Sequence, residues 1–231
     1  MKSYFVPYTL FFAAALLSAA CAGGDAAVLP YQADIRVADI PAVHLGELNV
    51  GTLRPFGKKV EFTPVSLTYH PRTDAIALEM RQGVLYRQYW TRRMREAFMD
   101  ALETYEADYA ARNLPGGSQN RTSRAYRSMT GKIEWRMSGI TREYQGFPVM
   151  ELGYRFESGS PYFTVTQRIA RDEREPDTSR QVSSGRMVFY FTRAMAKELA
   201  AFFDDEYLDR LVPEAELNTP PAVRTFPAEP Y

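Results

Sequence analysis

Residues 85–112, LYRQYWTRRMREAFMDALETYEADYAAR, contain the strongest periodic pattern in this chain of 231 residues. Large apolar residues recur there at spacings of three or four, which places them on one face of an α-helix. These residues are Trp90, Met94, Phe98, Leu102, Tyr105 and Tyr109. The segment 113–117, NLPGG, is typical of a helix end, because Gly caps helices and Pro cannot continue them. We therefore predict a helix from about Leu85 to Arg112, with Trp90, Phe98 and Leu102 almost fully buried.

Alternation of apolar and polar residues around this helix predicts β-strands with one buried face. The strands expected from it cover Lys59–Tyr69, Ile76–Met80, Ile133–Met137, Val149–Phe156, Phe163–Ile169 and Met187–Phe191. Thr192 is a suitable N-cap for a second helix, so strands followed by a helix occur twice and suggest two similar halves. Parallel strands buried on both faces would be more uniformly apolar. We predict one α+β domain, residues 35–212, with an antiparallel sheet and two amphipathic helices packed on one face.

The first 20 residues have the layout of a secretory signal rather than of a membrane span, which needs roughly 20 apolar residues. Lys2 supplies a positive charge, residues 4–17 are mostly apolar, and residues 18–20 are small. Cys21, the only cysteine, follows directly. The sequence Leu17-Ser18-Ala19-Ala20-Cys21 resembles the lipobox of bacterial lipoproteins, although Ser18 stands where such motifs usually carry Leu.

This resemblance implies that Cys21 receives a diacylglycerol and that acyl chains such as palmitate anchor the protein in the bacterial cell envelope. Ala22 is not the Asp that retains many lipoproteins at the inner membrane, so the outer membrane is expected. An ordinary secretory signal cut after Ala22 is the alternative, since small residues flank Cys21 on both sides. We assign residues 1–20 to the signal, 21–34 to a lipidated tether, and the Pro-rich residues 213–231 to an extended tail.

The charge balance argues against an overall attraction to nucleic acid, because Lys plus Arg and Asp plus Glu both number 28. The only histidines, His44 and His70, have no second ligand at a spacing typical of a zinc site. The chain contains no G-x-S-x-G, P-loop or G-x-G-x-x-G motif. We therefore expect no metal, no cofactor and no nucleic-acid partner.

Four arginines near the predicted helix start run against the helix dipole, which disfavours positive charge at that end: Arg87, Arg92, Arg93 and Arg95. They are the candidate binding residues, because Arg recognises anions with a forked geometry. A phospholipid headgroup is one such anion. The alternatives are that contacts elsewhere in the fold outweigh the dipole, or that Arg92 and Arg95 lay their aliphatic stems over the edge of the core.

Two mid-strand carboxylates, Glu134 and Glu151, are the remaining option for catalysis, because glycoside cleavage needs two carboxyl groups about 5–10 Å apart. The favoured interpretation is that both are solvated charges paired across strands with arginines such as Arg136 and Arg155, so no catalytic residue is assigned.

Five tyrosines lie off the predicted core faces, where they suit contacts with sugars or peptides, or a second sheet face covered by loops. They are Tyr86, Tyr89, Tyr144, Tyr162 and Tyr190. The sequence thus favours a non-catalytic binding or interaction module anchored to the membrane. Its expected partner is an envelope protein, a glycan or an anionic lipid headgroup. A carboxylate-dependent envelope hydrolase that acts on glycan is the alternative.

Overall fold

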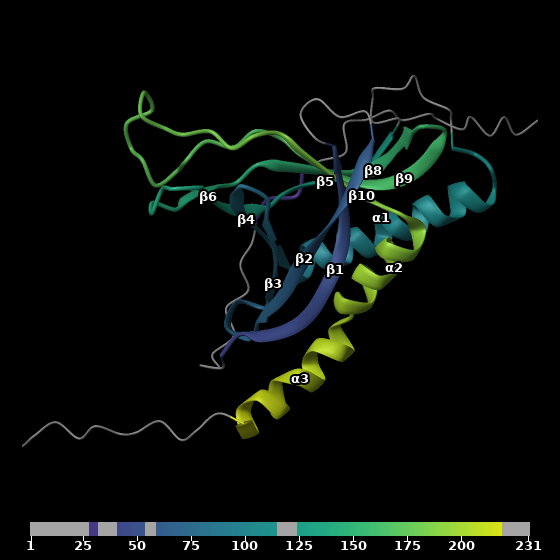
Figure 1. Ribbon diagram of the computed structural model, residues 1–231. Helices are drawn as coiled ribbons and strands as arrows, with labels where there is room; N and C mark the ends of the chain where they lie inside the picture. The colour runs from purple at the N-terminus through teal and green to yellow at the C-terminus, as the bar shows by residue number, and fades with distance from the viewer. Residues whose placement is uncertain (1–27, 32–40, 54–58, 115–123, 219–231) are drawn as a thin grey trace, which may run out of the picture.

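The computed structural model describes residues 28–31, 41–53, 59–114 and 124–218, which are built around one large β-sheet (Figure 1). Its ten strands are β1 (Val43–Leu53), β2 (Val60–His70), β3 (Ala75–Arg81), β4 (Val84–Thr91), β5 (Arg124–Thr130), β6 (Lys132–Met137), β7 (Tyr144–Gly146), β8 (Val149–Glu157), β9 (Ser160–Gln167) and β10 (Met187–Phe191). The helices of these residues are α1 (Arg92–Ala110), α2 (Arg193–Phe202) and α3 (Asp205–Asn218), together with a 3-10 turn at Pro71–Thr73.

Neighbouring strands are antiparallel along the whole order β5-β8-β9-β10-β1-β2-β3-β4-β6-β7. Strands of the two predicted halves are mixed in this order, since β1 pairs with β10 and β4 pairs with β6. The predicted α+β class with two similar halves is therefore wrong, and the fold is a β-rich half-barrel. The reason is that alternation identifies single strands, whereas their pairing into one curved sheet depends on contacts between distant residues.

The sheet must curve strongly, because only Gly131 separates β5 from β6, which lie near opposite ends of the strand order. In a flat sheet these two strands would be eight spacings apart, or about 38 Å at about 4.8 Å each. A single linking residue cannot span that distance. A Cβ at Gly131 would collide with the Met150 side chain and would press on Met94. Glycine at the bend between β5 and β6 therefore leaves room for the Met150 and Met94 side chains.

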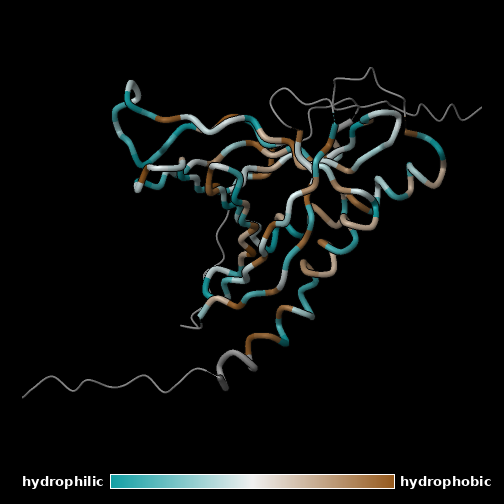
Figure 2. The backbone as a smooth tube through the Cα atoms, in the orientation of Figure 1, coloured by the Kyte–Doolittle hydropathy of each residue, from teal (hydrophilic) through white to brown (hydrophobic). Residues whose placement is uncertain are grey.

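Helices α1 and α2 pack against the inner face of the sheet, at the end where β4 and β10 finish (Figure 1). The ring of Phe98 lies 5.6 Å from that of Trp90 and 5.2 Å from that of Phe163, measured between centroids. The predicted burial of Trp90, Phe98 and Leu102 is confirmed, with exposed fractions of 0%, 0% and 6%. Figure 2 shows hydrophobic residues gathered where these helices meet the sheet, while the loop between β9 and β10 is mostly hydrophilic.

Helix α1 begins at Arg92, so the predicted start near Leu85 is wrong. The residues before it form β4, whose inward side chains Tyr86, Gln88 and Trp90 are all buried. Gln88 is satisfied inside the protein: its Oε1 accepts from Trp90 Nε1 at 2.9 Å, and its Nε2 donates to Met150 Sδ at 3.3 Å. A polar residue at an inward position hides the alternation that would have indicated a strand.

The ends of the chain differ in part from the predicted boundaries. The signal, Cys21 and most of the predicted tether lie outside the described residues. Leu29 lies within the predicted tether but is held by β5: its N donates to Ser128 O at 3.0 Å, and Thr130 N donates to Leu29 O at 2.6 Å. Helix α3 continues past Pro213, so the predicted extended tail begins as helix. No helix in the described parts of the chain has the length and hydropathy needed to span a bilayer.

Candidate functional site

Two of the four candidate arginines, Arg92 and Arg95, form ion pairs with carboxylates of the protein itself. Arg95 is only 1% exposed, and its Nη2 donates to Asp74 Oδ1 at 3.0 Å and to Asp205 Oδ1 at 2.7 Å. Arg92 Nε donates to Asp205 Oδ2 at 2.7 Å. Burial would raise the pKa of Asp205, but hydrogen bonds from Arg95 and Arg92 outweigh it and hold that pKa below its usual value. These contacts explain the basic residues at the start of α1, because Asp205 offsets the unfavourable dipole term.

The other two candidate arginines lie elsewhere. Arg87 belongs to β4 and points to the outer face of the sheet, where its Nε donates to Glu79 Oε2 at 2.6 Å. Arg93 is half-buried on α1 and forms no ion pair with the residues that the structure describes. The four side chains therefore do not form one site. An anion at Arg92 would compete with Asp205 for the guanidinium.

The candidate catalytic carboxylates, Glu134 and Glu151, are each engaged by cations rather than by each other. Glu134 on β6 accepts from Tyr89 Oη at 2.7 Å and lies 3.0 Å from Lys132 Nζ. Burial would raise the pKa of Glu134, but these two hydrogen bonds outweigh it and lower that pKa. Glu151 on β8 is bound by Arg168. The lowered pKa makes Glu134 poorly suited to be a general acid.

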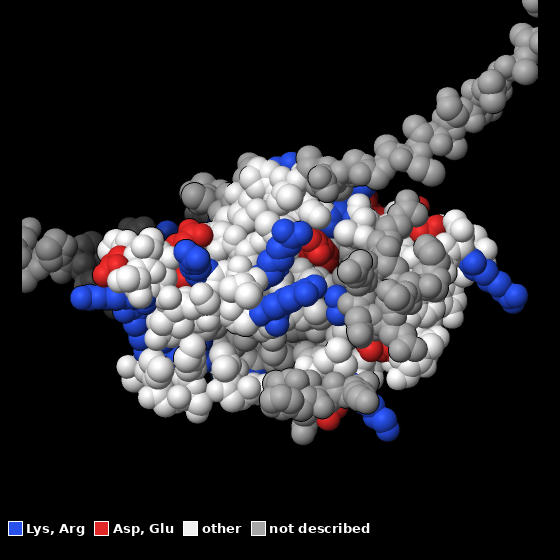
Figure 3. Space-filling model, turned by 90° about the horizontal axis from the view of Figure 1, so that it is seen from above, with Lys and Arg blue, Asp and Glu red and all other residues white. Residues whose placement is uncertain are grey.

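Charged side chains of both signs also meet on the upper face of the sheet. Figure 3, seen from above, shows basic and acidic groups next to one another in the middle of a mostly uncharged surface. Among the hydrogen bonds between charged groups, Arg168 Nε donates to Glu151 Oε1 at 3.0 Å. In the described parts of the chain, no group of three or more His, Cys, Asp or Glu side chains is placed to hold a metal ion. The most distinctive feature for binding therefore lies elsewhere in the sheet.

The sheet is weakly joined between β1 and β10. These strands share a single paired position, Gly51 with Tyr190, whereas β1 and β2 are paired from Val43 to Leu53. At that position the backbones approach closely, since a Cβ on Gly51 would lie 3.0 Å from Tyr190 O. On one side of this position, Thr52 and Leu53 of β1 are not paired with Met187 and Val188 of β10. We call this joint the β1–β10 seam.

A cleft of about 360 Å³ opens where the seam separates. Leu53, Met80 and Met187 supply apolar surface, while Arg155, Arg186 and Tyr190 supply polar groups. This volume is within the range of about 300–1,000 Å³ that is typical of small-molecule sites. A mixture of apolar walls and a few polar groups is also typical of such sites. We call this feature the seam cleft.

The polar wall of the seam cleft is organised by Tyr190, which is fully buried. Its Oη accepts from Arg155 Nη1 at 3.3 Å and donates to Glu157 Oε1 at 3.1 Å. Burial raises the pKa of Tyr190, and the neighbouring Arg155 opposes that rise. The hydroxyl therefore stays protonated at neutral pH and orients the Arg155 guanidinium beside the opening.

Another wall is the end of the loop between β9 and β10, residues 168–186, which projects beside β6 and β7 (Figure 1). Asp172 anchors this loop: it is fully buried and its Oδ1 accepts from Gln145 N at 3.1 Å and from Arg174 N at 3.2 Å. Arg142 Nη2 also lies 3.3 Å from Asp172 Oδ2. The anchored loop places Arg186 and Met187 at the cleft.

Most of the seam cleft could not be predicted from the sequence. Tyr190 is one of the five tyrosines predicted to lie off the core faces, and its burial favours a covered second face over an exposed contact residue. Met80 and Met187 look like ordinary strand residues, and Arg186 follows a loop without a motif. No local signal marks them, because the cleft exists only where two strands that are far apart in the chain separate.

Comparisons with known proteins give one match. Residues 42–210 match a family model described as "Uncharacterised Treponema protein". No curated protein and no solved structure matches the chain. The matched region begins just before β1 and ends within α3, so it includes every strand, the β1–β10 seam and the cleft. Since it covers well over half of the sequence, the chain belongs to this bacterial family of uncharacterised Treponema proteins.

Proposed function

We propose that the protein is a lipid-anchored, non-catalytic binding module of the bacterial cell envelope, and that the seam cleft is its binding site. The observation that carries this proposal is the β1–β10 seam, where a sheet otherwise joined by extended pairing is held at one position and hollowed beside it. The alternative of a glycan hydrolase has less support, because Glu134 and Glu151 are engaged by Lys and Arg side chains.

The anchor in this proposal is Cys21, at the end of the signal-like N-terminus. The family match supports it by its bacterial origin. Leu29, which is hydrogen-bonded to β5, is eight positions after Cys21 in the chain. A chain of that length reaches at most about 29 Å, so an acylated Cys21 would keep the domain close to the bilayer. We place the anchor in the outer membrane, because Ala22 is not an Asp.

Metabolic labelling with an alkyne fatty acid tests the anchor. Bacteria that express the full chain should yield a labelled, membrane-bound protein, and Cys21→Ala should lose the label. Ala22→Ser, which keeps the cysteine and a small following residue, is the control and should label like the wild type. Labelled Cys21→Ala protein, or wild type that is never labelled, would overturn the lipid anchor. Binding in the cleft is tested separately, on purified protein.

A further inference from the structure

Behind the seam cleft, the inner face of the sheet holds buried polar atoms that lack hydrogen bonds. Gln167 on β9 is 0% exposed, and neither its Oε1 nor its Nε2 has a partner in the part of the chain that the structure describes. Tyr86 Oη is also buried without a bond of normal geometry, and burial raises the pKa of Tyr86 well above its usual value. Most buried polar groups in proteins are hydrogen-bonded, so such atoms call for an explanation.

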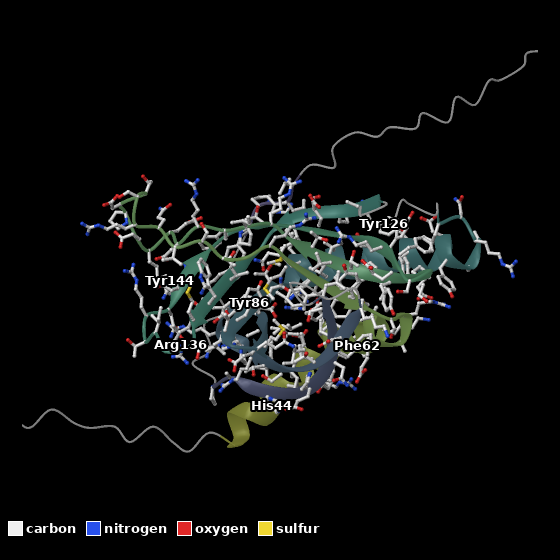
Figure 4. The ribbon with its side chains drawn as sticks, turned by 45° about the horizontal axis from the view of Figure 1, so that its top comes forward. His44, Phe62, Tyr86, Tyr126, Arg136 and Tyr144 are labelled. Atoms are coloured by element: carbon white, nitrogen blue, oxygen red, sulfur yellow. The ribbon has the colours of Figure 1, made fainter. Side chains whose placement is uncertain are left out.

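These atoms lie next to residues that line the cleft. Gln167 is directly paired with Met187 across β9 and β10, and Tyr86 is directly paired with Met80 across β3 and β4. The ring centroids of Tyr86 on β4 and Phe189 on β10 are 5.9 Å apart, so these two strands of the curved sheet face each other there. Figure 4 shows Tyr86 near the middle of the molecule, among the side chains between these strands. Gln167 and Tyr86 are thus each on the strand next to one that lines the cleft.

The opening of the cleft carries positively charged groups, whereas Met80 and Met187 in its lining are apolar. Arg186 is exposed there and has no carboxylate partner among the residues that the structure describes. The Arg155 guanidinium is oriented toward Tyr190 on the neighbouring wall. The cleft therefore offers guanidinium groups and the apolar side chains of Met80 and Met187, and the buried Gln167 lies on the strand next to Met187.

We infer that the seam cleft binds a small amphipathic carboxylic acid that has a hydrogen-bonding group at its far end. The carboxylate lies against Arg186 and Arg155, because guanidinium groups bind carboxylates with a forked geometry. The apolar body lies along Met80 and Met187. A terminal hydroxyl reaches the Gln167 amide and supplies the missing hydrogen bonds. This inference deepens the proposed function, since it rests on the seam cleft being the binding site.

Isothermal titration calorimetry with three probes of equal chain length tests the inference. The purified full-length protein, in a non-ionic detergent matched in cell and syringe, is titrated with 8-hydroxyoctanoate, octanoate and 1-octanol. We expect 8-hydroxyoctanoate to bind tightest and 1-octanol weakest. Arg186→Gln should weaken binding of both acids about tenfold, the loss expected for one charge-assisted hydrogen bond, and should leave 1-octanol unchanged. Arg180→Gln, an exposed arginine of the same loop that pairs with Asp177, is the matched control.

A second variant tests the inner end of the site. Gln167→Leu removes the buried amide at similar volume, so the ligand-free protein should unfold at a higher temperature. The same variant should bind octanoate and 8-hydroxyoctanoate equally well. If it still prefers the hydroxy acid, Gln167 does not recognise the far end of the ligand.

The outcomes separate this inference from the proposed function. If all three probes bind equally and Arg186→Gln changes nothing, the cleft remains a site but the acidic ligand is wrong. If none of the probes binds, the inference fails, and the proposed function loses its binding site. In both cases the labelling of Cys21 is unaffected, so the lipid anchor is judged on its own.

Discussion

The buried ion pairs of Arg95 predict that Arg95→Met will strongly destabilise the fold. Arg95 joins three elements, since it lies on α1 and contacts Asp74, before β3, and Asp205, at the start of α3. Its Nη1 also donates to Asp74 O at 2.8 Å. Methionine fills a similar volume without the charge, so the change removes the interaction and creates little cavity. The Asp74 carboxylate, 1% exposed, is then left without its guanidinium partner.

The size of the effect follows from burial. Breaking a buried ion pair by removing one partner costs about 3–5 kcal/mol, because the remaining charge stays desolvated. For a domain of this size, about 4 kcal/mol lowers the melting temperature by about 12 °C. Asp205 is 31% exposed at its side chain, and that part of the network is screened by solvent. We therefore expect Asp205→Asn to cost only about 1 kcal/mol.

Urea unfolding followed by tryptophan fluorescence measures this effect, since Trp90 and Trp135 are both buried. The midpoint should fall in Arg95→Met while the slope stays constant. Asp74→Asn keeps a hydrogen-bond acceptor, and Asn tolerates the left-handed backbone of this position, where φ is 44°. In the double variant neither charge is buried alone, so its cost should be below the sum of the single costs by about 2 kcal/mol. Strictly additive costs, or a loss under about 1 kcal/mol in Arg95→Met, would refute the reasoning.

Two further predictions concern the core and the response to acid. Phe98→Ala should cost about 3–5 kcal/mol in urea unfolding, because the ring is fully buried among Trp90, Phe163 and Phe203; an unchanged midpoint would contradict that packing. Stability should also fall as the pH drops below about 4, because the folded pKa of Asp205 lies below its unfolded value and the unfolded chain then binds more protons. The stability that ionised Asp205 contributes is complete above that pH and is lost as the pH falls through its folded pKa. Asp205→Asn should therefore show a smaller decline in the unfolding midpoint between pH 7 and pH 3.

Local patterns predicted individual elements better than the fold. The stripe from Met94 to Tyr105 identified the body of α1, because its spacing reports which face is buried. The same stripe placed Trp90 on the helix, since an inward residue of β4 happens to continue the spacing. Gln88 hides the strand pattern of β4, because a buried amide interrupts the alternation of apolar and polar residues that would indicate a strand.

The candidate site was harder to predict, because its determinants are non-local. Contacts within the fold and an external anion are both able to compensate the arginines at the start of α1, and the local sequence does not distinguish them. Contacts with Asp205, which is 110 positions from Arg95, provide much of the answer. Likewise, the seam cleft depends on where β1 and β10 separate, and these strands are distant in the chain. Neither relation can be derived from the residues around either partner alone.

The bend at Gly131 also orders the assembly of the sheet. Residues 124–157 form one long hairpin, because β5 pairs with β8 and β6 pairs with β7. Such a local ribbon forms faster than pairs of distant strands, and it offers one edge to β9 and another to β4. Growth from both edges then meets at β1 and β10, whose pairing is the shortest in the sheet. The last contact to form is therefore also the first that can open locally while the rest of the sheet stays folded.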